Sequence, residues 1–229
     1  EWAARGAMEQ YNIPADKVSV IPYGANIETN WTEKEVEQII QSKDHTHCKL
    51  LFVGVHWQRK GGDKALEVAK KLHESGIPTE LHILGSSPDA ETQIPSYVKV
   101  HGFVSKETEE GKQLIHDLIS SSHFLILPTL ADCTPIVFAE FNSYGIPCLT
   151  TDVGGIPTVV RDGVNGKLFS LDSGPEDYVR YIQSLFSEYD QYTRLANTSY
   201  KEYISRLNWT KSGEKMYRLL EQVIQTHPS

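Results

Sequence analysis

Residues 123–160 limit the possible folds of this chain more than any other stretch, because they contain two strand-loop-helix units in succession. Residues 123–127 form an apolar run with the length of a buried parallel strand, and residues 147–151 predict a second one. Thr134 and Pro135 are typical of a helix N-cap followed by proline at the first helical position. The pattern predicts a parallel α/β sheet with both loops at its carboxyl edge, where open α/β sheets bind ligands.

Two carboxylates, Asp132 and Glu140, flank the start of the first predicted helix. The amides of Ile136 and Val137 lie in its first turn, where backbone N–H groups lack helical partners and the dipole favours an anion, so they form a candidate phosphate seat. Glu140 shares their helix face about one turn, roughly 5–6 Å, further along. A phosphate would repel this carboxylate, whereas a diol such as a ribose could donate two hydrogen bonds to it. Asp132 could hold hydroxyls on the other side of the phosphates.

An alternative for either acid alone is an ordinary amphipathic helix, with Glu140 in solvent and Asp132 as a loop acid. The spacing of the two acids favours a binding site instead. So does the Val-Gly-Gly-Ile-Pro turn at residues 153–157, which is expected to open another helix.

These residues resemble the carboxy-terminal, donor-binding half of the retaining glycosyltransferases with a GT-B fold in glycosyltransferase family 4 (group 1). The mark of that family is a Glu-x7-Glu motif in this strand-loop-helix setting. The resemblance extends from about residue 49 to residue 208, and Gly54-x5-Lys60-Gly61 matches a second family anchor. It implies a Rossmann-like parallel sheet with helices on both faces, one half of a GT-B fold, followed by carboxy-terminal helices.

The resemblance implies a role for each residue of the first motif. Glu140 is expected to bind the nucleotide ribose and Asp132 the transferred sugar. The amides of Ile136 and Val137 are expected to hold the diphosphate, and Thr134 is expected to contact the donor. Asp132 is one methylene shorter than the usual glutamate, and Pro135 stands where glycine is common, which leaves the sugar contacts open.

The second anchor implies that Lys60, with an arginine, grips the donor diphosphate. The usual arginine directly after the first glycine is Val55 here, so Arg59 is expected to take its role. Expulsion of a nucleoside diphosphate builds negative charge on the leaving oxygens, which fixed cations stabilise and for which they can replace a metal ion. The alternative is a solvated basic pair in the loop that leads to Asp63, the expected N-cap of the next helix.

Two further strands are predicted at residues 79–84 and 97–101. By the resemblance, Gly54, Gly85, Phe103 and Val104 border the donor, with the last two at the edge of the base. Phe103 fits the core equally well. A helix is predicted to begin at residue 105 or 106.

Composition sets the outer limits. A chain of 229 residues with 39% hydrophobic residues can build one domain with a full core. Its net charge of −8 argues against nucleic acid or an anionic membrane as the main partner. No apolar run approaches the ~20 residues of a membrane span. Three scattered cysteines and the lack of a signal-like start favour the cytoplasm, with a peripheral membrane position left open for the full-length enzyme.

The remaining segments suggest how the chain is divided. A helix is predicted over residues 1–12, a strand over 17–24, and a helix from the capping box Thr32-x-x-Glu35. By the resemblance, residues 1–48 are a remnant of the amino-terminal half and the linker, 49–207 the nucleotide-sugar-binding domain, and 208–229 a crossover helix. The acceptor-binding half is then missing, so the chain is expected to bind donor weakly and to transfer nothing alone.

The sequence therefore predicts the donor-binding domain of a retaining, metal-independent hexosyltransferase that moves a sugar from a nucleotide diphosphate to a carbohydrate or lipid-linked acceptor. No cofactor is expected. One alternative is another GT-B enzyme, such as a nucleotide-sugar epimerase or a phosphorylase. The other is a non-enzymatic Rossmann module, although no strand here ends in Gly-x-Gly-x-x-Gly.

Overall fold

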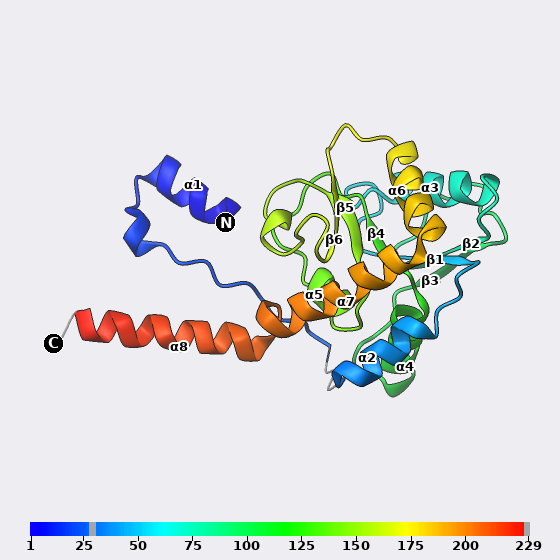
Figure 1. Cartoon of the computed structure of the whole chain (residues 1–229). Helices are drawn as coiled ribbons and strands as arrows, with labels where there is room; N and C mark the ends of the chain where they lie inside the picture. Colours follow the sequence, from blue (N-terminus) through cyan, green and yellow to red (C-terminus); the bar gives the residue numbers. More distant parts are fainter. Residues whose placement is uncertain (28–30, 227–229) are drawn as a thin grey trace.

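The chain is built around one six-stranded sheet, which the computed structural model shows at the centre of the molecule (Figure 1). The structure describes residues 1–27 and 31–226. All neighbouring strands run parallel, in the order β3-β2-β1-β4-β5-β6. The strands are β1 (Cys48–Val53), β2 (Thr79–Leu84), β3 (Val98–Gly102), β4 (Phe124–Leu127), β5 (Cys148–Thr151) and β6 (Gly166–Phe169). This is the doubly wound Rossmann order, which confirms the predicted fold class.

The central strands are buried because helices cover both faces of the sheet. Every residue of β4 and β5 is buried, and β1 pairs with β4 through Leu50 and Phe124. Such strands appear in a sequence as continuous apolar runs, which is the pattern that predicted them. The strands β2, β3, β4 and β5 each begin and end within one residue of the positions predicted at residues 79–84, 97–101, 123–127 and 147–151.

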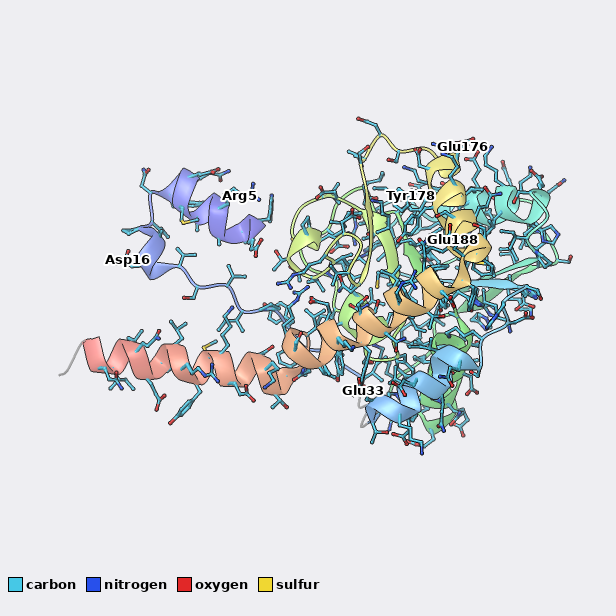
Figure 2. The ribbon with its side chains drawn as sticks, in the orientation of Figure 1. Arg5, Asp16, Glu33, Glu176, Tyr178 and Glu188 are labelled. Carbon is cyan, nitrogen blue, oxygen red and sulfur yellow. The ribbon has the colours of Figure 1, made fainter. Side chains whose placement is uncertain are left out.

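The helices form the outer layers. Their bounds are α1 (Trp2–Tyr11), α2 (Glu33–Gln41), α3 (Gly62–Glu74), α4 (Glu109–Ser121), α5 (Val137–Asn142), α6 (Pro175–Ser187), α7 (Tyr189–Arg206) and α8 (Trp209–Thr226). Two 3₁₀ turns, η1 (Ala15–Lys17) and η2 (Ile156–Thr158), complete the described elements. Helix α3 packs against α6, where Lys71 lies 2.9 Å from Glu176 (Figure 2), and α7 contacts α2, α5 and α6. Helices α2 and α4 lie side by side and line one cavity (Figure 1).

The capping box at the start of α2 is confirmed. The Thr32 amide donates to the Glu35 carboxylate at 2.7 Å, and the Glu35 amide donates to the Thr32 hydroxyl at 3.3 Å. These two bonds satisfy backbone groups that have no partner inside the helix.

The predicted strand over residues 17–24 is wrong. Residues 15–17 form η1, and residues 18–24 lie outside every strand of the sheet. An apolar run becomes a strand only where a neighbouring strand supplies hydrogen-bond partners. Here the carbonyls of Val20 and Pro22 instead accept hydrogen bonds from side chains of α8, Lys215 at 2.7 Å and Ser212 at 2.6 Å. Arg5 and Asp16 mark this amino-terminal part in Figure 2, where it lies apart from the sheet.

Two predicted helix starts also differ. Gly61, not Asp63, is the N-cap of α3. Asp63 lies in the first turn of the helix, and its carboxylate accepts a hydrogen bond from the Trp57 ring nitrogen at 2.7 Å. Helix α4 begins at Glu109, later than predicted, and its cap is Thr108, whose hydroxyl accepts from the Gly111 amide at 3.1 Å. Residues 103–107 are therefore a loop at the carboxyl edge of the sheet.

Helix α8 extends away from the sheet (Figure 1). It carries a stripe of apolar side chains, of which Met216, Leu220 and Val223 are exposed. None of the ten residues of α1 is buried. The described residues contain no helix with the length and hydrophobicity that a bilayer crossing needs.

Candidate functional site

The site lies where the direction of strand succession reverses, between β1 and β4. The loops that follow these two strands, residues 54–61 and 128–136, are joined by their backbones. The carbonyl of Arg59 accepts hydrogen bonds from the Thr129 hydroxyl at 3.0 Å and the Leu130 amide at 2.9 Å. In doubly wound sheets this position is where ligands bind.

Gly61 makes this close approach possible. Its φ is 77°, a left-handed conformation, and a Cβ at this position would lie 2.0 Å from the carbonyl oxygen of Pro128. Only glycine avoids both the strained backbone and the collision. The second family anchor therefore fixes the distance between the two loops.

Three of the predicted catalytic residues meet across this junction. The Lys60 ammonium donates a hydrogen bond to the Asp132 carboxylate, and the Arg59 guanidinium lies 3.6 Å from the same carboxylate. Arg59 also donates to the carbonyl of Ala131 at 2.9 Å. The side chains of Lys60 and Asp132 are each 13% exposed, so the alternative of a fully solvated basic pair is wrong for Lys60.

A glycine turn supports the Asp132 loop from behind. The Gly155 amide donates to the Asp132 carbonyl at 3.2 Å. A Cβ on Gly155 would lie 1.7 Å from the carbonyl oxygen of Cys133, and one on Gly154 would lie 2.1 Å from that of Asp132. The predicted turn at residues 153–157 is thus a contact surface for the loop, and it opens the short 3₁₀ turn η2.

Thr134 is not the predicted N-cap. Helix α5 begins at Val137 with Ile136 at the N-cap, while the Thr134 hydroxyl donates to the carbonyl of Cys133 at 2.6 Å. The hydroxyl lies too early in the chain to reach the first helical turn. Among the hydrogen bonds of the described residues, none is donated by the amides of Ile136 or Val137. Both amides remain available for an anion.

Glu140 is buried, with 5% of its surface exposed, so the alternative of a solvent-facing acid is wrong. Its carboxylate lies 2.6 Å from the ammonium of Lys106, which comes from the loop between β3 and α4. Sequence reasoning assigned no functional role to Lys106. A lysine in a polar loop, 34 residues from its partner, carries no local signal of this contact.

The ends of the first three strands are tied together at the same edge. The Gly54 amide donates to the carbonyl of Leu84 at 3.0 Å, and the Gly85 amide donates to that of Gly102 at 2.7 Å. Phe103 follows and is 81% exposed, so it is not a core residue; Val104 is half-buried against the core. The structure therefore places Gly54, Gly85 and the loop of Phe103 at one edge of the sheet.

Groups suited to other chemistry lie elsewhere. Within the described ranges, no group of three histidine, cysteine, aspartate or glutamate side chains is arranged to hold a metal ion. His123 is buried, as predicted, and packs beside Phe186 and Tyr192. Cys48 and Cys148 are buried free thiols.

The sequence matches a known protein family and several of its relatives. Residues 47–188, more than half of the chain, match the family model "Glycosyl transferases group 1". The chain is 24% identical over 226 residues to D-inositol 3-phosphate glycosyltransferase of Nocardiopsis dassonvillei, covering 93% of this chain and 52% of that protein. It is 23% identical to spore coat protein SA of Bacillus subtilis, covering 90% and 59%. The chain thus spans little more than half the length of these relatives.

Solved structures share the fold. Sucrose-phosphate synthase from Thermosynechococcus elongatus superposes with a TM-score of 0.71 at 16% identity, covering 97% of this chain and 57% of that chain. Anabaena HepE in complex with UDP gives 0.68 at 14% identity, covering 96% and 62%. At such identities the likeness concerns the fold alone. The family match, which includes both loops of the site, shows that the chain belongs to the group 1 glycosyltransferases.

Proposed function

We propose that this chain binds a nucleotide-diphosphate sugar between the loops that follow β1 and β4, as the donor-binding domain of a retaining hexosyltransferase. The observation that carries the proposal is the ion pair of Lys60 with Asp132 across the centre of the sheet. It places a cation for a phosphate and an acceptor for sugar hydroxyls next to one another, at the position where doubly wound sheets bind ligands.

The diphosphate would lie against Lys60, Arg59 and the two unpaired amides at the start of α5. When the bond between the sugar and the diphosphate breaks, negative charge grows on the leaving oxygens. Cations and amides that already point at this position stabilise that charge without reorganising, which is the main route by which such sites lower a barrier. We propose that these groups perform this task without a metal ion.

The nucleoside would extend from the diphosphate towards Glu140 and the β3–α4 loop. The buried Glu140 carboxylate can accept hydrogen bonds from the two ribose hydroxyls. The strand ends at Gly54 and Gly85 and the exposed side of Phe103 and Val104 would border the base. HepE, which shares the fold, has structures in complex with UDP and UDP-glucose.

The sugar would lie on the side of Asp132, whose carboxylate can accept hydrogen bonds from its hydroxyls. Asp132 meets Lys60 on one oxygen, so a sugar hydroxyl can approach the other. Retention of the anomeric configuration and placement as a carboxy-terminal half within glycosyltransferase family 4 rest on the motif Asp132-x7-Glu140. We propose that a carbohydrate or lipid-linked hydroxyl is the acceptor, that residues outside this chain bind it, and that the enzyme acts in the cytoplasm. This chain alone should therefore transfer no sugar.

Calorimetric titration of the chain with UDP, GDP, ADP and CDP, and with their common sugars, tests the proposal. One diphosphate is expected to bind saturably. Replacement of Glu140 by alanine is expected to weaken that binding by about 1.5–3 kcal/mol, the range for hydrogen bonds to a charged group. The matched control is Glu37→Ala, which removes an exposed carboxylate on α2. Absence of binding by all four, up to millimolar concentration, would contradict the proposal.

A further inference from the structure

Lys106 and Glu140 form an ion pair, and the proposed donor site gives the lysine of this pair no role. The Lys106 ammonium lies 2.6 Å from Oε1 of Glu140. The two side chains differ in their surroundings: the lysine is 49% exposed, whereas the glutamate is 7% exposed. A half-solvated cation thus reaches from a loop to a carboxylate that water scarcely touches.

A carboxylate with so little access to water is costly to bury unless it is paired with a positive charge and hydrogen-bonded. Among the contacts of the described residues, Lys106 is the one side chain that hydrogen-bonds the Glu140 carboxylate, and it meets Oε1. No described group donates to Oε2. The pair therefore supplies charge compensation while leaving acceptor capacity free.

The fold determines the position of Lys106. Its loop begins where β3 ends at Gly102 and closes at the Thr108 cap of α4. A Cβ on Gly111, in the first turn of α4, would lie 2.0 Å from the carbonyl oxygen of Ser105. Helix and loop are thus in backbone contact one residue before Lys106, which holds the base of this side chain in place.

We infer that Lys106 is a positioning residue for donor recognition: its ammonium holds the Glu140 carboxylate through Oε1 and leaves Oε2 free for the ribose hydroxyls. The inference rests on the proposed function, in which Glu140 binds the ribose. A carboxylate oxygen can accept more than one hydrogen bond, so a fixed Oε2 can accept from both hydroxyls of a diol. Lys106 also joins the loop expected to border the base to the group expected to bind the ribose.

The proposed role of Lys106 predicts which part of donor recognition is lost when the lysine is replaced. A lysine that acts through Glu140 contributes to the recognition of the diol and not to that of the phosphates. The test compares a ribonucleoside diphosphate with its 2′,3′-dideoxy analogue, using the base that the wild-type chain binds among UDP, GDP, ADP and CDP. The wild-type chain is expected to prefer the ribonucleotide by about tenfold to a hundredfold, as for hydrogen bonds to a charged group.

Five variants distinguish a role through Glu140 from the other roles that Lys106 could have. Lys106→Met is expected to lower the ribose preference to about that of Glu140→Gln, and Lys106→Arg to restore most of it, because a guanidinium can pair with the same oxygen. Lys106→Met in the Glu140→Gln background is expected to have no further effect. Lys70→Met is the matched control, since Lys70 is an exposed lysine on α3 and its loss should leave the preference unchanged.

Each other result overturns the inference in a distinguishable way. If Lys106→Met keeps the ribose preference, Glu140 does not depend on Lys106, while the proposed function stands. If Lys106→Met weakens both nucleotides equally, also without Glu140, the lysine contacts phosphate or supports the loop instead. If the wild-type chain binds none of the four diphosphates up to millimolar concentration, the proposed function itself fails and the role of Lys106 with it.

Discussion

Lys60 donates a hydrogen bond to the carboxylate of Asp132, which joins the loop after β1 to the loop after β4 at the centre of the sheet. Among the described residues, Asp132 is the charged partner of Lys60. A donor that binds here must therefore compete with Asp132 for Lys60. The two members of the pair should then respond to substitution in opposite ways.

We predict that Lys60→Met lowers the affinity for the nucleoside diphosphate about tenfold or more, because a charge-assisted hydrogen bond to phosphate is lost. Asp132→Asn should instead keep or raise that affinity, since Lys60 is released from its acid partner. It should also remove any advantage of the nucleotide sugar over the nucleotide alone. Calorimetry with both ligands measures the two effects. Equal losses in the two variants would contradict the separate roles.

The glycine turn behind the Asp132 loop should tolerate no side chain. Gly155→Ala would place a Cβ 1.7 Å from the carbonyl oxygen of Cys133, in a contact between two backbones. We expect a loss of about 2 kcal/mol or more in the free energy of unfolding, within the range for overpacked sites. Urea denaturation measures it.

The control for this experiment is Gly213→Ala in α8, where nothing lies within 4 Å of the added Cβ. Alanine replaces glycine inside a helix there, so the free energy of unfolding should rise by up to about 1 kcal/mol. Similar effects of the two substitutions would show that the turn and the loop are not in contact.

The two threonines near predicted helix starts should differ in their contribution to stability. Thr108 caps α4 through the Gly111 amide, so Thr108→Ala is expected to cost about 1 kcal/mol. Thr134 caps no helix, and its hydroxyl bonds only to the preceding carbonyl. Thr134→Ala should therefore change the free energy of unfolding by less than about 0.5 kcal/mol. If Thr134→Ala lowers the free energy of unfolding more than Thr108→Ala does, Thr134 caps a helix, as predicted from the sequence.

His123 should make the fold sensitive to acid. Burial, together with the positive charge of Lys43, lowers the pKa of His123 to about 3. Its Nδ1 accepts a hydrogen bond from the Lys49 amide at 3.1 Å and its Nε2 lies 3.0 Å from the Asp44 carbonyl, an arrangement that suits the neutral ring. Protonation of Nδ1 would break the first bond.

The sign of the effect follows from which state takes up the proton. The unfolded chain protonates this histidine near pH 6.5 and the folded chain near pH 3, so stability is lost as the pH falls between these values. At pH 4 the loss should reach roughly 3 kcal/mol relative to pH 6.5. In His123→Asn this part of the pH dependence should disappear from urea denaturation curves. A variant with the wild-type slope would exclude His123 as its source.

The sheet was predictable from sequence because its strands carry a simple signal. Strands such as β4 and β5 are buried on both faces and appear as unbroken apolar runs. The nearness of Lys60 and Asp132 was predictable for a related reason: each lies in the loop after such a strand, and parallel strands bring their carboxyl ends to one edge.

The caps and the partner of Glu140 were not predictable. Several polar residues near a helix start can cap it, but the Asp63 carboxylate, inside the first turn of α3, accepts a hydrogen bond from the Trp57 ring nitrogen instead. Lys106 stands in a polar loop, and its contact with Glu140 exists only after β3 and β4 have taken their places in the sheet. The local sequence pattern predicts helices and strands, whereas the contact of Lys106 with Glu140 depends on how those helices and strands pack together.

The separation of Lys60 and Asp132 along the chain has a consequence for the order of folding. The two residues are 72 positions apart, and α3, β2, β3, α4 and β4 lie between them. Contacts that close so long a loop form late, because the entropy of the intervening chain must be overcome first. The junction that holds both charges should therefore be among the last parts of the molecule to assemble. Early intermediates, even those with much of their secondary structure, should have no site at all.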